Sequence, residues 1–314
     1  MKINSRKLQK TAGILMVLSI FSALFCGCSR GSGVGEEEQN TFRIVTSFYP
    51  MYTMVSGITE GVSGVEVVNM ASPQTGCLHD YQLRPKDLVC LEDADLFVIN
   101  GGGMEEFLSD VFESREDLKV VSAMDALEEA ELLPGGEEDE GGNPHTWMNP
   151  ALYQKEVEYL TDILAKEDPD HAGAYEANAQ DSINKIQTLS KEIDRLRTCD
   201  SGKEKTGCIL LHESFAYLMD AMDIPVVKVM DVEKDSGFSA GELKELVDET
   251  KEISRGIIVS DKQYSGKIAE LLAEETGFEV VHLDACVSGE LKKDAYIDSM
   301  EYNLEEWKKC SGEQ

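Results

Sequence analysis

Short apolar segments alternate with longer amphipathic segments along most of this chain. The apolar segments are rich in Val and Ile, and they predict the β-strands Phe42–Phe48, Gly64–Met70, Leu96–Asn100, Lys119–Ser122, Cys208–Leu211, Val226–Met230, Gly256–Ser260 and Glu279–Leu283. The amphipathic segments predict the helices Met51–Glu60, Pro85–Glu92, Met104–Phe112, Phe215–Met222, Ala240–Ile253, Gly266–Thr276 and Asp294–Lys309. Strands that alternate with helices are typical of parallel sheets covered on both faces, so we predict an α/β fold.

A long helix is predicted between the two sets of strands. Apolar residues spaced three and four apart form one helical stripe within Ala172–Thr198: Ile183, Ile186, Leu189, Ile193 and Leu196. A separate helix, Ala151–Lys166, precedes it. We therefore expect two lobes, each with a parallel sheet flanked by helices, joined by a long rigid helix. The predicted bounds are 42–168 for the N-terminal lobe, 169–199 for the connecting helix and 200–314 for the C-terminal lobe.

The N-terminus is typical of an exported protein. Basic residues at positions 2, 6, 7 and 10 are followed by Thr11–Gly27, which carries no charge. This order of a basic region and an apolar region indicates a signal peptide. A small residue, Gly27, precedes Cys28, which resembles a bacterial lipobox and predicts removal of residues 1–27 and lipidation of Cys28. The alternative is an uncleaved anchor helix. Either way, residues 28–41 form a flexible tether and the rest lies outside the cytoplasm.

The chain is strongly acidic. Its formal charge is −31, and loss of the four basic residues of the signal would leave about −35. Such a surface repels nucleic acid and anionic headgroups, and it is compatible with a cationic ligand. The segment Glu128–Asn143 concentrates acidic residues among glycines, which predicts a mobile insertion. It is either a solvated surface loop or a loop that collects cations.

Six of the eight cysteines lie beyond Cys28. An even number outside the cytoplasm permits disulfides, and Cys199 with Cys208, which flank a polar loop, is the favoured pair. No two cysteines are spaced as Cys-x-x-Cys, which argues against a zinc site built from cysteines.

Three of the five histidines and one aspartate lie where α/β folds place ligand groups. His79 and His145 lie in loops of the first half, while His212 and Asp284 follow predicted strands of the second half. Neutral imidazoles with one carboxylate suit Zn²⁺, whereas oxygen-rich sets favour Mg²⁺, Ca²⁺ or Mn²⁺. The spacing alone leaves ordinary capping or surface histidines as the alternative.

Several segments resemble, in order, those of the zinc/manganese solute-binding family of ABC importers. They are Thr46–Pro50, His79–Leu83 with Pro85 and Asp87, Ala94–Gly101 with Gly103 and Glu105, His145–Pro150, His212 with Phe215–Leu218, and Asp284 with Tyr296, Met300, Asn303 and Leu304. The similarity covers about residues 42–308. It implies two lobes with a metal cleft between them and metal-ligand roles for His79, His145, His212 and Asp284.

The resemblance also implies a function. We expect a monomeric lipoprotein on the outer side of the membrane that captures Zn²⁺ and delivers it to the permease and ATPase of an ABC importer, with no nucleic-acid partner. Manganese-selective relatives tend to carry glutamate at the third ligand position, so His212 favours zinc over Mn²⁺. A Mn²⁺-binding member of the family and a surface adhesin lipoprotein are the alternatives.

Four further residues lie within two positions of these ligands: Cys77, Glu213, His282 and Cys286. Cys77 and Cys286 could reach the metal, form a disulfide, or remain thiols near the site, while Glu213 and His282 could support a ligand. An enzyme is not expected, because Ala216 stands four residues after His212 and a His-Glu-x-x-His zinc motif is therefore lacking.

Overall fold

The computed structural model describes residues 41–78, 81–135, 142–200, 206–230, 239–264 and 266–311. The predicted signal peptide, Cys28 and most of the tether therefore lie outside the described residues, as does His79. Within the described ranges, no helix combines the length and the apolar character that crossing a membrane requires. Contacts group residues 41–314 into one compact unit, so the lobe boundaries given above stay a prediction.

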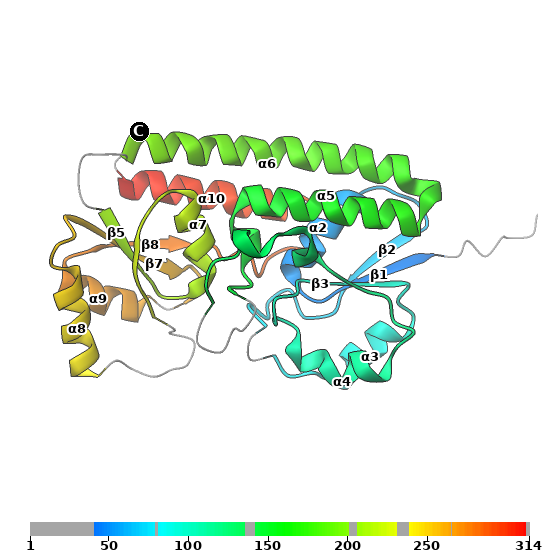
Figure 1. The fold of residues 1–314 in the computed structure, drawn as a ribbon, viewed down its shortest axis with the longest axis horizontal. Helices are drawn as coiled ribbons and strands as arrows, with labels where there is room; N and C mark the ends of the chain where they lie inside the picture. Colours follow the sequence, from blue (N-terminus) through cyan, green and yellow to red (C-terminus); the bar gives the residue numbers. More distant parts are fainter. Residues whose placement is uncertain are drawn as a thin grey trace, which may run out of the picture. The chain divides into compact units, whose positions relative to one another are not determined.

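Two four-stranded parallel sheets form the frame of this described part (Figure 1). The first contains β1 (Phe42–Thr46), β2 (Val65–Asn69), β3 (Leu96–Ile99) and β4 (Val120–Ser122), in the order β2-β1-β3-β4. The second contains β5 (Thr206–Leu210), β6 (Val226–Val229), β7 (Arg255–Asp261) and β8 (Glu279–Leu283), in the order β6-β5-β7-β8. The two sheets share one strand order, and the predicted fold with two parallel sheets is confirmed.

The helices follow the predicted segments closely. They are α2 (Tyr49–Thr59), α3 (Pro85–Glu92), α4 (Ser109–Ser114), α5 (Pro150–Glu167), α6 (Ala172–Asp200), α7 (Ala216–Ala221), α8 (Ala240–Thr250), α9 (Lys267–Thr276) and α10 (Ala295–Ser311). Short 3-10 turns cover Glu106–Leu108, Ala123–Ala126, Glu129–Glu131, Thr146–Met148, Pro169–His171 and Glu213–Phe215. The segment predicted as a helix over Met104–Phe112 forms a 3-10 turn, Glu106–Leu108, followed by α4 (Ser109–Ser114). The three glycines before it all have positive φ, so the helix cannot extend back through them.

Each sheet buries apolar side chains on both faces, because successive side chains of a strand point to opposite sides. In β1, Ile44 packs into the core shared with the long helices, and Val45 packs into a second core with Leu91 of α3. In β5, Leu210 packs into the same shared core, and Ile209 packs into another core on the opposite face of the sheet. This two-sided burial explains why the strands have near-continuous apolar sequences.

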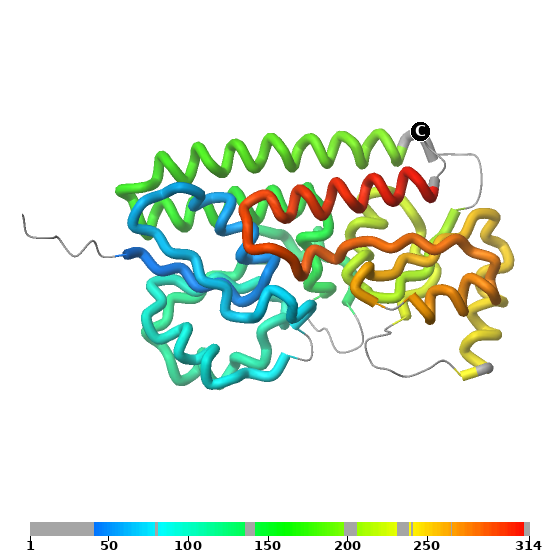
Figure 2. The backbone as a smooth tube through the Cα atoms, turned by 180° about the vertical axis from the view of Figure 1, so that it is seen from behind, coloured from blue at the N-terminus to red at the C-terminus, as the bar shows by residue number. Residues whose placement is uncertain are grey.

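The predicted long helix is confirmed as α6, which runs alongside both halves of the described chain, and α10 packs beside it. The predicted stripe on α6 is confirmed, since its five apolar residues are each no more than 9% exposed. α6 contacts α2, α5 and α10, and α10 contacts both β8 and α2 (Figure 2). The sequence predicted α10 as a helix of the C-terminal lobe alone. Its apolar face in fact spans both halves of the main core, with Tyr296, Met300, Leu304 and Trp307 buried there.

Two sequence expectations about loops need correction. The described start of the acidic segment is ordered: Glu129–Glu131 forms a 3-10 turn, and the Asn143 amide donates to the Leu133 carbonyl at 2.8 Å. Residues 136–141 lie outside the description. Cys208 is a free thiol buried in β5, where burial raises its pKa to about 12, so the predicted bridge to Cys199 is not formed. The side chain of Cys199 is not among those described.

Glu156 of α5 is a carboxyl group inside the main core. The Thr146 hydroxyl donates to its Oε1 at 2.6 Å, and no described group pairs with its Oε2. Burial disfavours the charged form and raises the pKa of Glu156 to about 8. The side chain is therefore protonated at neutral pH in the folded protein and ionised in the unfolded chain.

We expect the free energy of unfolding of the metal-free protein to fall as pH rises from about 4.5 to about 8, because over this range the folded state holds a proton that the unfolded chain has released. The slope from this group approaches about 1.4 kcal/mol per pH unit. Glu156→Gln should remove that contribution, while Glu158→Gln, on the exposed side of α5, should keep it. Urea unfolding at a series of pH values measures this. Parallel pH dependences for the wild type and Glu156→Gln would contradict the assignment.

Candidate metal centre

His145 lies in a fully buried loop between residues 142 and 149, just before α5. Its Nδ1 is 2.8 Å from Oδ1 of Asn143, an oxygen that can only accept, so Nδ1 carries the ring proton. Asn143 is oriented by two further bonds, because its Oδ1 accepts from the His145 amide and its Nδ2 donates to the Glu213 carbonyl. The neutral imidazole therefore presents the lone pair of Nε2, the atom that would bind a metal.

His212 follows β5 at the carboxyl end of the second sheet and is 6% exposed. The Ser214 amide donates to its Nδ1 at 3.0 Å, which caps the turn Glu213–Phe215. In the neutral ring the proton therefore lies on Nε2. Binding a metal through Nε2 requires this proton to leave and the Ser214 bond to break, whereas binding through Nδ1 replaces the Ser214 bond directly.

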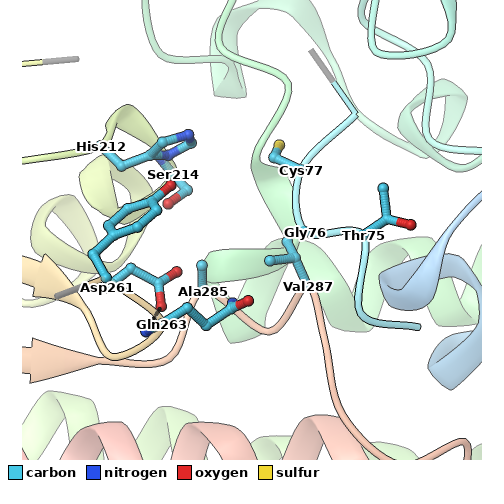
Figure 3. Close-up of a pocket in the computed structure, with 10 residues that line it drawn as sticks. Thr75, Gly76, Cys77, His212, Ser214, Asp261, Gln263, Ala285 and Val287 are labelled. Atoms are coloured by element: carbon cyan, nitrogen blue, oxygen red, sulfur yellow. Dashed lines mark hydrogen bonds between the residues drawn. The ribbon is translucent and has the colours of Figure 1, made fainter. Parts of the chain in front are cut away.

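Three donor side chains come together here from three separate segments. One donor atom from each of Cys77, His145 and His212 lies within 4.8 Å of the others. The two imidazole rings have centroids 5.3 Å apart and are perpendicular. Cys77 and His212 face each other across a cavity of about 320 Å³ (Figure 3). It is lined by Thr75, Gly76, Cys77, His212, Ser214, Asp261, Gln263, Tyr264, Ala285 and Val287.

Asp284 follows β8 and is 1% exposed, but its carboxylate is not part of this three-residue cluster. Its Oδ2 forms an ion pair of 2.6 Å with Nζ of Lys262, and its Oδ1 accepts from the Cys286 amide. Asn303 of α10 holds the backbone of Asp284 through two hydrogen bonds of 2.6 and 2.8 Å. The structure thus fixes Asp284 at the end of the sheet and gives its charge a lysine partner.

Asp261 is a site residue that the sequence analysis missed. It ends β7, lines the cavity with His212, and is 4% exposed. Its burial, and next to that the neighbouring charge of Asp284, raises its pKa to about 6, although a bond from the Gln263 amide acts in the opposite direction. The sequence feature that could have indicated Asp261 is a carboxylate directly after a predicted buried strand. The same feature indicated Asp284.

The other four predicted neighbours occupy different surroundings. Glu213 Oε1 lies 3.6 Å from Nδ1 of His145, whereas His282 is exposed on β8. Cys286 is buried, donates its thiol to the Asp284 carbonyl at 3.6 Å, and has a pKa raised well above its ordinary value by burial and by the charges of Asp284 and Asp261. No disulfide joins it to Cys77 in the described structure.

The described donors are two imidazole nitrogens and one sulfur, all within reach of one cavity. Such a set suits a cation of intermediate softness, and the carboxylates of Asp261 and Asp284 at the same sheet edge add negative charge. His79 lies outside the described residues, two positions beyond Cys77.

Comparisons with known proteins agree with this arrangement. A family model described as the periplasmic component A of a zinc-uptake complex matches residues 44–310. The high-affinity zinc uptake system protein ZnuA of Bacillus subtilis is 30% identical over 315 residues, which cover 95% of this chain and 96% of that protein. The manganese-binding lipoprotein MntA of Halalkalibacterium halodurans is 25% identical, with 93% and 95% covered.

Among solved structures, the fold resembles Zn(II)-bound AdcA from Streptococcus pneumoniae with a TM-score of 0.70 and 26% identity, over 87% of this chain and 58% of that one. The match of the family model to most of the chain and the alignment with ZnuA along nearly its full length agree with each other. On this evidence the chain belongs to the family of periplasmic component A proteins of zinc-uptake complexes.

Proposed function

We propose that this protein is an extracytoplasmic lipoprotein that captures Zn²⁺ and delivers it to the permease and ATPase of an ABC importer. The observation that carries the proposal is that donor atoms of Cys77, His145 and His212 lie within 4.8 Å of one another, beside a cavity that Cys77 and His212 line. We propose His79, His145, His212 and Asp284 as the zinc ligands. His79 enters this set from its sequence motif, because it lies outside the described residues.

Zinc is favoured over manganese by the donor types. Imidazole nitrogen binds Zn²⁺ more tightly than Mn²⁺, which is the weakest binder in the order of divalent first-row metals. Relatives of both kinds exist, since the family includes proteins named for zinc and for manganese. Two described imidazoles, with a third proposed at His79, support the proposal that this site prefers zinc.

The proposed role is to carry the ion, without catalysis. Four protein ligands occupy every position of a tetrahedral zinc ion, so no site is left for an activated water. Loading must rearrange the described contacts, because His212 caps its turn through Nδ1 and Asp284 is paired with Lys262. The same contacts re-form when the ion leaves. Re-forming them lowers the free energy needed to release the ion to the importer.

We expect His145→Ala and His212→Ala each to weaken zinc binding by at least about a hundredfold, because each removes a direct ligand. His282→Ala is the matched control, since His282 is exposed on β8, and it should bind zinc as the wild type does. Competitive titration of the purified metal-free protein against a zinc chelator measures the affinities. Wild-type affinity in both ligand variants would rule out this cavity as the zinc site.

Lys262→Met should strengthen zinc binding by about tenfold, equivalent to about 1.4 kcal/mol, because lysine and zinc compete for the carboxylate of Asp284. The same change should lower the stability of the metal-free protein, since it leaves a buried carboxylate unpaired. Lys251→Met, which removes an exposed ion pair with Asp248, is the control for both measurements. An unchanged zinc affinity in Lys262→Met would argue against Asp284 as a ligand.

The lipid anchor gives a separate prediction in cells. Cys28→Ser should abolish incorporation of labelled fatty acid and release the protein from the membrane fraction, because Cys28 follows Gly27 at the end of the apolar segment. Cys26→Ser should leave both unchanged. If the wild type stays in the membrane fraction without incorporating fatty acid, the uncleaved anchor helix is the correct interpretation.

A further inference from the structure

The thiol of Cys77 lies against a proposed zinc ligand. Its Sγ is 3.2 Å from Nε2 of His145 and 3.9 Å from Sδ of Met104. Because Nδ1 of His145 donates to Asn143, Nε2 must be the acceptor and the thiol the donor. A cation that replaces the proton between sulfur and nitrogen could therefore bind both atoms.

The distances fit a tetrahedral site. Zinc binds sulfur at about 2.3 Å and imidazole nitrogen at about 2.0–2.1 Å, which puts two such donors about 3.5 Å apart. The 3.2 Å separation of Cys77 and His145 is already close to this value. The largest separation in the cluster is within 4.8 Å, so a shift of about 1 Å brings the His212 donor to the same ion.

The loop that carries Cys77 is held in place from both sides. The Thr75 amide donates to the Ser72 carbonyl, and the Gly289 amide, beyond β8, donates to the Pro73 carbonyl. Gly76 has a φ of +82°, which only glycine adopts readily, and the turn directs the next side chain into the cavity (Figure 3). Because the loop already holds the sulfur in this place, the side chain would lose little conformational entropy on binding a metal.

We infer that Cys77 is a direct thiolate ligand of the transported ion, taking the tetrahedral position proposed above for His79 beside His145, His212 and Asp284. This sulfur makes the site selective for zinc over manganese. The inference rests on the proposed function. On binding, the thiol releases its proton to solvent and the sulfur–metal bond takes its place. Thiolate is a soft donor that zinc accepts and manganese binds poorly, so sulfur increases the preference that the imidazoles already give. Its negative charge also offsets one of the two positive charges of the ion.

Cys286 is the competing source of sulfur, and its geometry disfavours it. Its thiol faces the Asp284 carbonyl at 3.6 Å, and it does not belong to the three-residue cluster. Cys90, half-buried on α3, and Cys310, on α10, lie on elements that contribute nothing to the cavity. These three cysteines therefore provide controls within the same chain.

Cobalt substitution tests the inference. The Co²⁺-loaded full-length protein, kept in a non-thiol reductant, should show a near-ultraviolet charge-transfer band from sulfur to cobalt. Cys77→Ser should lose this band, and Cys90→Ser should keep it. Competitive titration should show the ratio of zinc to manganese affinity falling at least about tenfold, or about 1.4 kcal/mol, in Cys77→Ser and not in Cys90→Ser.

Zinc X-ray absorption of the wild type gives a reading that needs no variant, with one sulfur expected at about 2.3 Å. Tight zinc binding with only nitrogen and oxygen neighbours would overturn the role of Cys77 and leave the proposed function intact. A band lost in Cys286→Ser and kept in Cys77→Ser would also overturn it. Failure of the wild type to bind zinc at all would overturn the proposed function and this inference with it.

Discussion

The loop from residue 143 to residue 148 bonds to the second half of the chain, and the metal centre depends on this junction. The Asn143 side chain donates to the Glu213 carbonyl, and the Tyr217 hydroxyl donates to the Asn143 carbonyl at 2.8 Å. The buried indole of Trp147 donates to the Ala285 carbonyl at 3.0 Å, and Tyr296 donates to the Trp147 carbonyl. The bonds made by Tyr217, Trp147 and Tyr296 are buried, so breaking one leaves an unpaired polar group out of water, which costs free energy. They place His145 beside His212 before any metal binds.

The buried carboxyl groups of Asp284, Glu156 and Glu105 are each stabilised in a different way. Asp284 has a lysine partner, Glu156 keeps its proton, and Glu105 accepts from Ser47 and from two backbone amides. A chain of net charge −31 needs such arrangements, since an isolated buried carboxylate would lower stability by several kcal/mol. In the proposed site, an arriving cation can replace Lys262 as the charge that balances Asp284. Metal binding and stability are therefore coupled through Asp284.

The tautomers of the two histidines make the centre asymmetric. Asn143 fixes His145 with its Nε2 lone pair available, whereas the Ser214 amide fixes His212 with Nδ1 engaged. In the proposed site, His145 and Cys77 form a prepared pair, and His212 is the donor that must change its bonding. Such a division suits a carrier, because a fully prepared site would bind the ion too tightly to release it.

The sequence by itself determined the strands, the helices and the stripe on α6, because these depend on side-chain periodicity within short segments. Its motifs also indicated His145, His212 and Asp284 as candidates. Only the tertiary structure decided that Cys77 lies against His145, 68 positions away, and that Lys262 pairs with Asp284. Asp261 and the span of α10 across both halves likewise depend on how the two sheets and their loops pack. Contacts between distant segments are set by packing of the whole core. Local sequence patterns therefore do not predict which loops this packing brings together.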